Sequence, residues 1–390
     1  MSRQSVNIHE QFRLFALRNN DKNWRIKVKK LKLILAAVLM LVATGSYAQL
    51  AGKNVILIQG FLPWHIPLPP SDNGQADGIA YWDSFDPALK DPATTKILYW
   101  PSSKRLPGAG GIAELIATQL QPILSSGHCD NDCIIITHST GDLVMRYVLA
   151  NKTSLLGSAL ADRFKVAAVI DMAGAGGGTE LANFGVDVVN GINHGADILE
   201  ALLEFLGYNL EIGMDPGVAI DLQPTVARGT AVNTFPSIPR LRIAGSGDEL
   251  YGFATHPLIK GTDDSVVPLH SACGAALDQG YDSCVQDLRM DGRVTTVSNA
   301  PSLNQLYNFH FPVIMSEKMA HNEMQADKDG RDMTFALSGA NLYNSSSAKT
   351  IDVDVEYHTV YAWWDWFREY RYITDADDKT MGRVILDSFE

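Results

Sequence analysis

Residues 134–142 read Ile-Ile-Ile-Thr-His-Ser-Thr-Gly-Asp, and this stretch decides the fold of the chain. The run of isoleucines predicts a short buried strand, and the apolar residues after Asp142 recur at helical spacing. A serine on a tight turn between a strand and a helix is typical of a nucleophile elbow. Such a turn holds the hydroxyl above the sheet, beside the positive end of the helix. Gly141 fits the usual Gly-x-Ser-x-Gly pattern, whereas Thr137 takes the place of its first glycine. The sequence therefore indicates that Ser139 is a nucleophile.

Further strands and helices alternate on both sides of this elbow. Apolar runs predict strands at 54–58, 96–100, 166–172, 241–245 and 309–315. Residues 112–120 form one apolar face of a helix that Pro122 should end or kink. This alternation predicts an α/β fold with a mostly parallel sheet flanked by helices and joined by right-handed crossovers.

The length and charge of the chain limit its domain number and its partners. Its 390 residues suffice for one large domain or two ordinary ones. A net charge of −12 argues against nucleic acid as a partner. The glycines at 174–178 lack the Gly-Lys-Ser/Thr of a P-loop, so no phosphate loop is expected there.

The first 48 residues have the pattern of an export signal. Lys29, Lys30 and Lys32 precede the apolar run 33–43, and small residues follow up to Ala48. This run is too short for a stable membrane span, so we expect a signal peptide cleaved after Ala48 and a secreted or periplasmic protein. Without residues 1–48, 32 − 9 = 23 basic and 44 − 2 = 42 acidic residues remain, a net charge of −19.

The chain has four cysteines. An even number in an exported protein suggests disulfides, and the spacing favours two local bridges, Cys129–Cys133 and Cys273–Cys284. The alternative is a zinc site, but Cys-x3-Cys without a matching second pair does not favour it.

A small-residue turn after the first strand is a candidate for half of an oxyanion hole. Residues 54–58 run into Gly60 and Phe61, some 80 residues before Ser139. We expect the backbone N–H groups of Phe61 and Thr140 to hold the negative oxygen that forms in an acyl-transfer transition state. The alternative for Gly60 is a simple tight turn.

The remaining members of a catalytic triad are expected late in the chain. Asp263, in a turn after a late strand, is the first choice for the acid, ahead of Asp264 and then Asp248. His321 is the expected general base, and His310 is the second choice. The order serine, acid, histidine is that of α/β-hydrolases.

Three further segments carry expectations. Residues 183–235 are irregular and contain an amphipathic helix near 198–206, which is either a lid or a helix packed on the core. Residues 327–332 are acidic but lack EF-hand spacing, so a solvated turn is expected. Residues 333–390 are expected to be a β-rich extension of a hydrolase domain at 49–332, with strands at 351–355 and 384–386. The aromatic residues at 361–372 are expected in a core, with docking of lipid or sugar as the alternative.

Several segments together resemble the bacterial true lipases of the α/β-hydrolase fold. Residues 138–144 are similar to their His-Ser-Met-Gly-Gly-Leu-Val, and 171–182 to their segment after the elbow. Residues 263–268 are similar to their Asp-Gly-x-Val and to the Asp-Asp-Thr-Val of the lecithin–cholesterol acyltransferase family. Residues 319–321 resemble their histidine loop. The resemblance covers about residues 53–325 in separate islands and leaves out 333–390.

This resemblance implies hydrolysis of acyl esters, of lipids in particular, through a covalent acyl-enzyme on Ser139. It implies no required cofactor. Some lipases of this kind hold a structural calcium, whose ligands the sequence does not place here. A lipid–water interface is an expected partner. Two alternatives stay open: acyl transfer by the same triad, and a hydrolase-fold protein that binds without catalysis.

Overall fold

The computed structural model describes residues 50–192, 211–231, 237–249, 252–277, 284–297, 306, 310–326, 332–336, 341–344, 347 and 349–389. The expected signal peptide, the expected helix at 198–206 and most of the acidic turn at 327–332 lie outside these residues. Among the residues described, none of the helices has the length and apolar character to cross a bilayer.

Seven strands form one sheet in the order β2-β1-β3-β4-β5-β6-β7. The first six are parallel and β7 is antiparallel to β6, as expected for a mostly parallel sheet. Their bounds are β1 Asn54–Ile58, β2 Thr95–Leu98, β3 Cys133–His138, β4 Val166–Met172, β5 Arg240–Gly245, β6 His310–Ser316 and β7 Met333–Phe335. The strands expected at 54–58, 96–100, 166–172, 241–245 and 309–315 are confirmed to within two residues at each end, and the strand expected at 351–355 overlaps β9 Lys349–Asp352.

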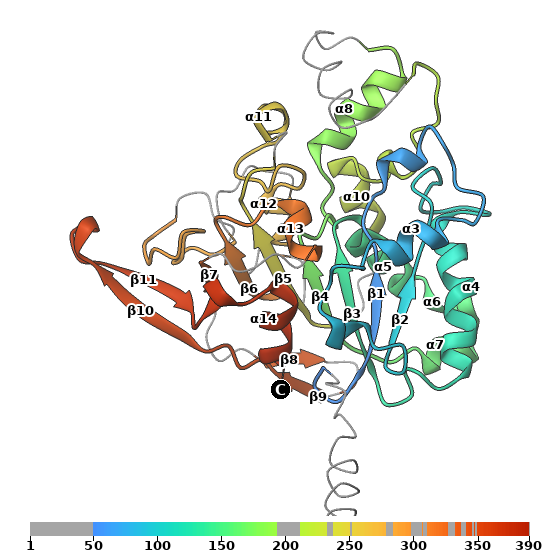
Figure 1. The fold of residues 1–390 in the computed structure, drawn as a ribbon. Coiled ribbons are helices and arrows are strands. Elements are labelled where there is room, and N and C mark those ends of the chain that lie inside the picture. Colours follow the sequence, from blue (N-terminus) through green and yellow to red (C-terminus); the bar gives the residue numbers. More distant parts are fainter. Residues whose placement is uncertain are drawn as a thin grey trace, which may run out of the picture. The chain divides into compact units, whose positions relative to one another are not determined.

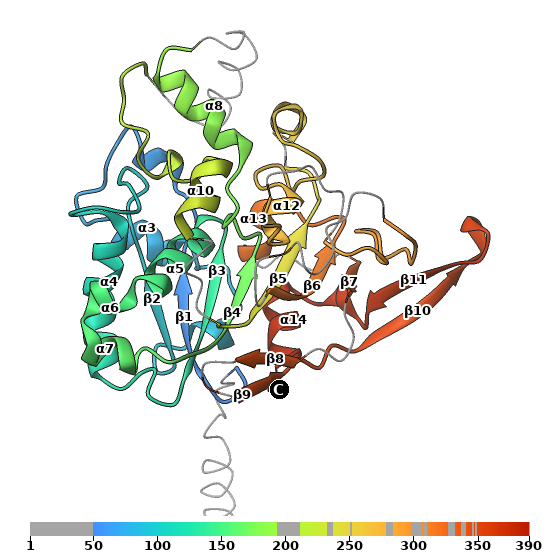
Figure 2. The same cartoon turned by 180° about the vertical axis from the view of Figure 1, so that it is seen from behind.

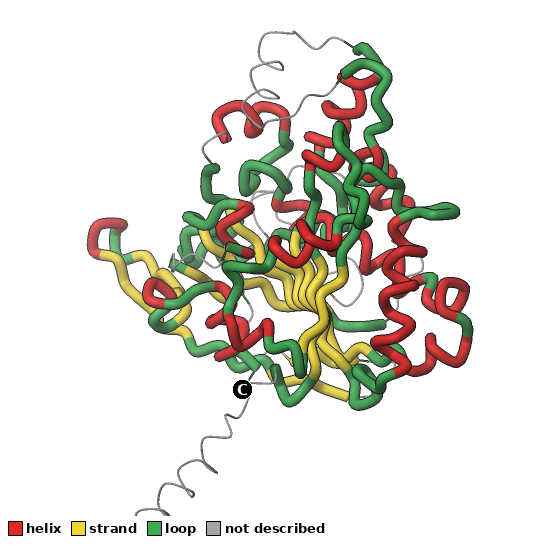
Figure 3. The backbone as a smooth tube through the Cα atoms, turned by 45° about the vertical axis from the view of Figure 1, so that its right-hand side comes forward, coloured by secondary structure: helices red, strands yellow, loops and turns green. Residues whose placement is uncertain are grey.

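Helices lie on both sides of this twisted sheet (Figures 1 to 3). They are α3 Gln75–Ala80, α4 Ile112–Ser125, α5 Thr140–Ala150, α6 Lys152–Leu156, α7 Ser158–Arg163, α8 Glu180–Val189, α10 Pro224–Ala231, α11 Gly252–Thr255, α12 Leu269–Ala272, α13 His321–Gln325 and α14 Met381–Asp387. Helix α4 continues through Pro122 to Ser125, so this proline does not end it.

The sheet separates two apolar clusters, because successive side chains of a strand point to opposite faces. Ile135 and Val169 belong to the cluster that includes the apolar residues of α4 and α5. Ile134 and Ile170 belong to the other cluster, which includes the apolar residues of α14. Both faces of the central strands are therefore covered, as their continuous apolar sequences require.

The C-terminal part differs from the expected β-rich extension. Residues 384–386 belong to α14, not to a strand. Thr380 begins this helix, since its Oγ1 accepts a hydrogen bond from the Arg383 N–H (3.2 Å). Strand β7 joins the main sheet, and two antiparallel hairpins follow it: β8 Asn341–Asn344 with β9 Lys349–Asp352, and β10 Tyr357–Ala362 with β11 Arg368–Ile373.

The four cysteines form the two local bridges that their spacing favoured. Cys129–Cys133 closes the turn before β3, and Cys273–Cys284 lies after α12. Both bridges flank segments that carry residues of the candidate site.

Candidate active site

Ser139 stands on a strained turn between β3 and α5. Its backbone has φ 55° and ψ −127°, outside the regions that side chains normally favour. Three backbone hydrogen bonds hold this conformation: the Ser139 N–H donates to Met172 O, and its carbonyl accepts from the N–H groups of Asp142 and Ala175. Strained residues of this kind gather at functional sites. The geometry is that of the elbow predicted from the sequence.

Two glycines let the chain approach this turn closely. A Cβ on Gly141 would lie 2.7 Å from the Gln59 carbonyl oxygen, so a side chain here would push α5 away from the end of β1. A Cβ on Gly60 would lie 2.8 Å from the Ser139 Cβ. The turn after β1 therefore lies directly against the serine, where a loop that contributes to an oxyanion hole must be.

The two expected oxyanion donors lie on the segments that meet at Ser139. Thr140 is the first residue of α5, and Phe61 follows Gly60. Within the described part of the chain, neither N–H group donates a hydrogen bond to another group of the protein. Both lie where a helix start or a small-residue turn offers N–H groups to an anion.

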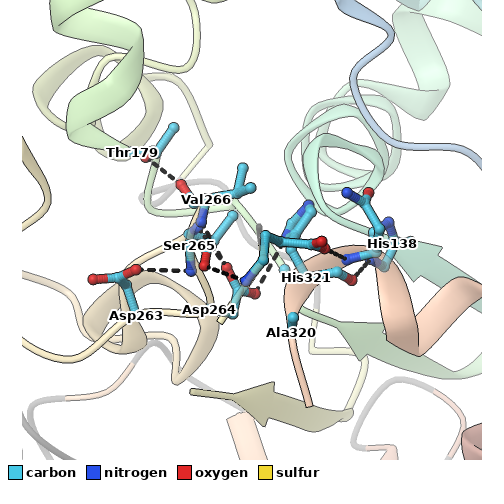
Figure 4. A network of polar contacts seen from close by, with 12 residues as sticks. His138, Thr179, Asp263, Asp264, Ser265, Val266, Ala320 and His321 are labelled. Atoms are coloured by element: carbon cyan, nitrogen blue, oxygen red, sulfur yellow. Dashed lines mark hydrogen bonds and ion pairs between the residues drawn. The ribbon is translucent and has the colours of Figure 1, made fainter. Parts of the chain in front are cut away.

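Asp264, not Asp263, holds His321. The Nδ1–H of His321 donates to Asp264 Oδ2 at 2.9 Å, and the backbone N–H of His321 donates to the Asp264 carbonyl at 3.1 Å. Both side chains are buried. Figure 4 shows the Asp263 carboxylate turned away from His321. The expectation that placed Asp263 beside this ring is therefore corrected to Asp264, the second choice.

The turn that carries Asp264 is itself fixed. Asp264 Oδ1 accepts hydrogen bonds from the N–H groups of Val266 (3.1 Å) and Val267 (2.7 Å). Thr179, which begins α8, donates its hydroxyl to the Val266 carbonyl at 2.6 Å (Figure 4). With one oxygen bound to the turn and the other to His321, the carboxylate has little freedom to rotate.

His138 joins the histidine loop to the elbow. Its Nε2–H donates to the His321 carbonyl at 3.0 Å, and its ring centroid lies 4.7 Å from that of His321. A neutral imidazole that donates at Nε2 accepts at Nδ1, where the Tyr81 hydroxyl makes a short hydrogen bond. Burial, together with the neighbouring His321, holds the pKa of His138 well below its ordinary value. His138 is thus neutral, and its hydrogen bond to the His321 carbonyl holds the histidine loop beside the elbow.

Asp263 serves a second histidine. Its Oδ1 lies 2.6 Å from His256 Nδ1 and accepts the Ser265 N–H at 2.7 Å. His256 Nε2 lies 2.8 Å from Asp248 Oδ1, so the third candidate for the acid also binds this ring. Burial alone would lower the pKa of His256, but the carboxylates of Asp263 and Asp248 outweigh it and raise that pKa. This group joins the loop after β5 to the turn that carries Asp264.

Thr137, which replaces the first glycine of the elbow pattern, and Asp142 are linked through Asp171 and Arg240. Thr137 Oγ1 donates to Asp171 Oδ1 at 2.5 Å. Asp142 Oδ1 accepts from Arg146 Nε (2.8 Å) and Arg240 Nη1 (2.7 Å), and the same Arg240 atom lies 3.0 Å from Asp171. All five side chains are buried. Burial raises the pKa of Asp171 to about 6, against the opposing effect of Arg240.

Sequence reasoning missed this ion cluster and the roles of Tyr81 and His256. One signal was present: Asp142 and Arg146 are spaced i, i+4 in a mostly apolar helix, and Asp171 is the single charged residue of the apolar strand β4. His310, the second choice for the base, begins β6. His270 is buried between Arg228 and Glu180. The described residues contain no group of three His, Cys, Asp or Glu side chains that could hold a metal ion.

Comparisons with known proteins find likeness only in structure. No family model and no curated protein matches the chain. The mature form of the Bacillus licheniformis lipase BlEst2 is 14% identical, covers 70% of this chain and 86% of its own, and has a TM-score of 0.40. Lipase 1 of Pelosinus fermentans is 12% identical and covers 70% and 93%, with a TM-score of 0.39. The Staphylococcus hyicus lipase is 12% identical and covers 70% and 89%, with a TM-score of 0.35. The chain is thus similar in structure, at low sequence identity, to these bacterial lipases.

Proposed function

We propose that this chain is a serine ester hydrolase in which Ser139 is the nucleophile, His321 the general base and Asp264 the orienting acid. The observation that carries the proposal is the pair formed by His321 and Asp264 beside a strained serine elbow. Because Nδ1 of His321 is occupied by Asp264, its Nε2 is left to accept a proton.

The proposed reaction has two halves. His321 Nε2 takes the proton of the Ser139 hydroxyl as the Ser139 oxygen attacks the ester carbonyl carbon. The N–H groups of Phe61 and Thr140 donate to the carbonyl oxygen as it becomes negative. When the tetrahedral intermediate collapses, the ester C–O bond breaks and His321 gives its proton to the leaving alcohol. Water, deprotonated by His321, then attacks the acyl-enzyme and releases the acid and Ser139.

The substrate class follows from this machinery. An oxyanion hole and a triad act on acyl carbonyls, and a lipid ester is the substrate that the resemblance implies. Hydrolysis rates across p-nitrophenyl esters of increasing acyl length would separate an esterase from a lipase. A lipase is expected to keep or gain activity as the chain lengthens, whereas an esterase loses it.

A fluorophosphonate probe tests the proposal most directly. It should label the unaltered protein covalently, label Ser139→Ala not at all, and label Ser126→Ala normally, since Ser126 lies exposed at the end of α4. Labelling of Ser139→Ala at the level of the unaltered protein, or none of the unaltered protein, would rule out the proposed nucleophile. The second result would favour a hydrolase-fold protein that only binds.

We also propose that residues 1–48 direct export. The two disulfides support this, because such bridges persist in oxidising compartments. N-terminal sequencing of the protein from a culture medium or periplasmic extract should begin at Gln49. A mature protein that begins at Met1 would contradict it.

A further inference from the structure

The hairpin of β10 and β11 carries aromatic side chains at an exposed tip. Figures 1 and 2 both show the hairpin leaving the body of the protein, with its tip away from the sheet. Five aromatic side chains at this tip are between 64% and 90% exposed: Tyr361, Trp363, Trp364, Trp366 and Phe367. The expectation that these aromatics pack in a core is therefore wrong for the tip. Three of the seven tryptophans of the chain lie on this surface.

Strand β11 and the turn at the tip are held by a neighbouring segment, residues 292–294. The Arg371 N–H donates to the Gly292 carbonyl (2.8 Å), and the Val294 N–H donates to the Glu369 carbonyl (2.9 Å). Arg293 pairs with Asp365 at 3.0 Å. The backbone of the tip is thus held by neighbouring residues while its aromatic rings stay exposed.

The turn at the tip would be easier to form with other residues. Trp366 and Phe367 both have positive φ, 50° and 59°, a region that glycine and asparagine tolerate and bulky residues do not. The backbone therefore gives no reason for large aromatic rings at these two positions. Their exposure leaves both rings available for a contact outside the chain.

The charge of the tip identifies the kind of partner. Residues 361–371 contain two acids, Asp365 and Glu369, and two bases, Arg368 and Arg371, so 2 − 2 leaves no net charge. The whole chain is acidic, at −12, and anionic surfaces would repel it. An uncharged aromatic tip on an acidic protein fits an uncharged or zwitterionic surface.

The ring geometry favours insertion over stacking on a flat ligand. The planes of Trp363 and Trp364 are 85° apart, with centroids 6.1 Å apart. Perpendicular rings form no flat platform for a sugar. Tryptophan and tyrosine are, however, the residues enriched where apolar material meets water at a membrane surface.

We propose that the tip formed by Tyr361, Trp363, Trp364, Trp366 and Phe367 docks the protein on an uncharged or zwitterionic lipid–water interface. This deepens the proposed function, because it names the surface on which an ester hydrolase would meet an insoluble substrate. Docking needs no chemistry at Ser139, so the two proposals can fail separately.

Vesicle binding tests the inference in a Ser139→Ala background, which prevents lipid cleavage. Phosphatidylcholine vesicles with brominated acyl chains should bind this protein and quench its tryptophan fluorescence. Trp363→Ala/Trp364→Ala should lower the partition coefficient about tenfold or more, since each ring adds apolar area to the contact. Binding should not weaken at high salt and should not increase with anionic lipid.

Three controls separate docking from other effects. Trp366→Asn/Phe367→Gly removes two rings while suiting the positive φ values, so binding should fall without a loss of urea stability. Tyr343→Ala removes an exposed aromatic side chain from β8, outside the tip, and should bind normally. All variants keep the same N-terminus, because residues 33–43 are themselves apolar.

The inference is overturned if the background protein does not bind these vesicles, or if the tip variants bind as well as it does. It is also overturned if the tip variants lose only self-association in solution or only retention on a polysaccharide. Fluorophosphonate labelling of the protein with an unaltered Ser139 is unaffected by any of these results and tests the chemistry alone.

Discussion

Asp263 and Asp264 are neighbours in the chain, yet their carboxylates bind different histidines. Asp264→Asn should reduce kcat on p-nitrophenyl butyrate about a thousandfold to ten-thousandfold, with KM little changed, because the amide no longer orients and stabilises the imidazole. Asp263→Asn should keep most of the activity, since its carboxylate lies against His256. Steady-state kinetics of the two variants would decide between the two residues. A larger loss for Asp263→Asn would refute the assignment.

The sequence could not choose between these two aspartates. Adjacent residues of a turn point their side chains in different directions, so a shift of one residue exchanges their partners. The choice depends on Ser265, whose φ of 78° turns the chain, and on the Val266 and Val267 N–H groups that fix Asp264. Neither feature is visible in the motif Asp-Asp-Ser-Val-Val. Ser139 and His321 could be proposed from the sequence because the order serine, acid, histidine is fixed in α/β-hydrolases.

Loss of the Asp142 carboxylate from the buried ion cluster should strongly destabilise the fold. Asp142→Ala should lower the free energy of unfolding by about 3 to 5 kcal/mol, because it leaves Arg146 and Arg240 buried without this carboxylate. Asp130, which pairs with Arg163 in water, provides the control, and Asp130→Ala should leave the urea midpoint unchanged. Equal midpoints for the two variants would show that the buried cluster adds nothing.

At the scale of an element, His256 should make the loop after β5 sensitive to pH. Its folded-state pKa lies above the ordinary 6.5, because the carboxylates of Asp263 and Asp248 outweigh burial. The stability from this pairing is therefore fully present below pH 6.5 and is lost as the pH rises through the folded-state pKa.

This expectation is checked by urea unfolding of the unaltered protein and of His256→Gln at about pH 6 and about pH 9. The unaltered protein should be the more stable at the lower pH, and the difference should shrink at the higher pH. Groups that both proteins share cancel in the comparison. A difference that grows with pH would mean that His256 is not protonated in the folded state.

The central strands were predictable and the last helix was not. A strand such as 166–172 is apolar apart from Asp171 because helices cover both faces of a parallel sheet, and such a run stands out in the sequence. Residues 384–386 are also apolar, but three residues fit a strand and a helix equally. Tertiary packing favours the helix. The apolar residues of α14 pack in the cluster on one face of the sheet, and Thr380 caps the start of the helix.

At the scale of the whole molecule, α14 makes the C-terminal residues part of the core of the seven-stranded sheet. Residues 48–390 form one compact unit, and Ile385 is fully buried in the cluster that includes Ile134 and Ile170. The aromatic side chains of the β10–β11 tip, by contrast, are exposed to solvent. The segment after β7 thus has two parts, one buried against the sheet and one exposed.

Ile385→Ala should therefore destabilise the whole fold and not a separate extension. We expect one cooperative unfolding transition whose free energy falls by about 2 to 5 kcal/mol, the usual cost of a cavity in a packed core. Ile212→Ala, at a residue that is 77% exposed, should change it by less than about 0.5 kcal/mol. Circular dichroism and fluorescence followed through urea should give the same midpoint in each protein. If Ile385→Ala instead produces an early transition that leaves fluorophosphonate labelling of Ser139 intact, then the C-terminal residues fold separately, and the sheet is stable without α14.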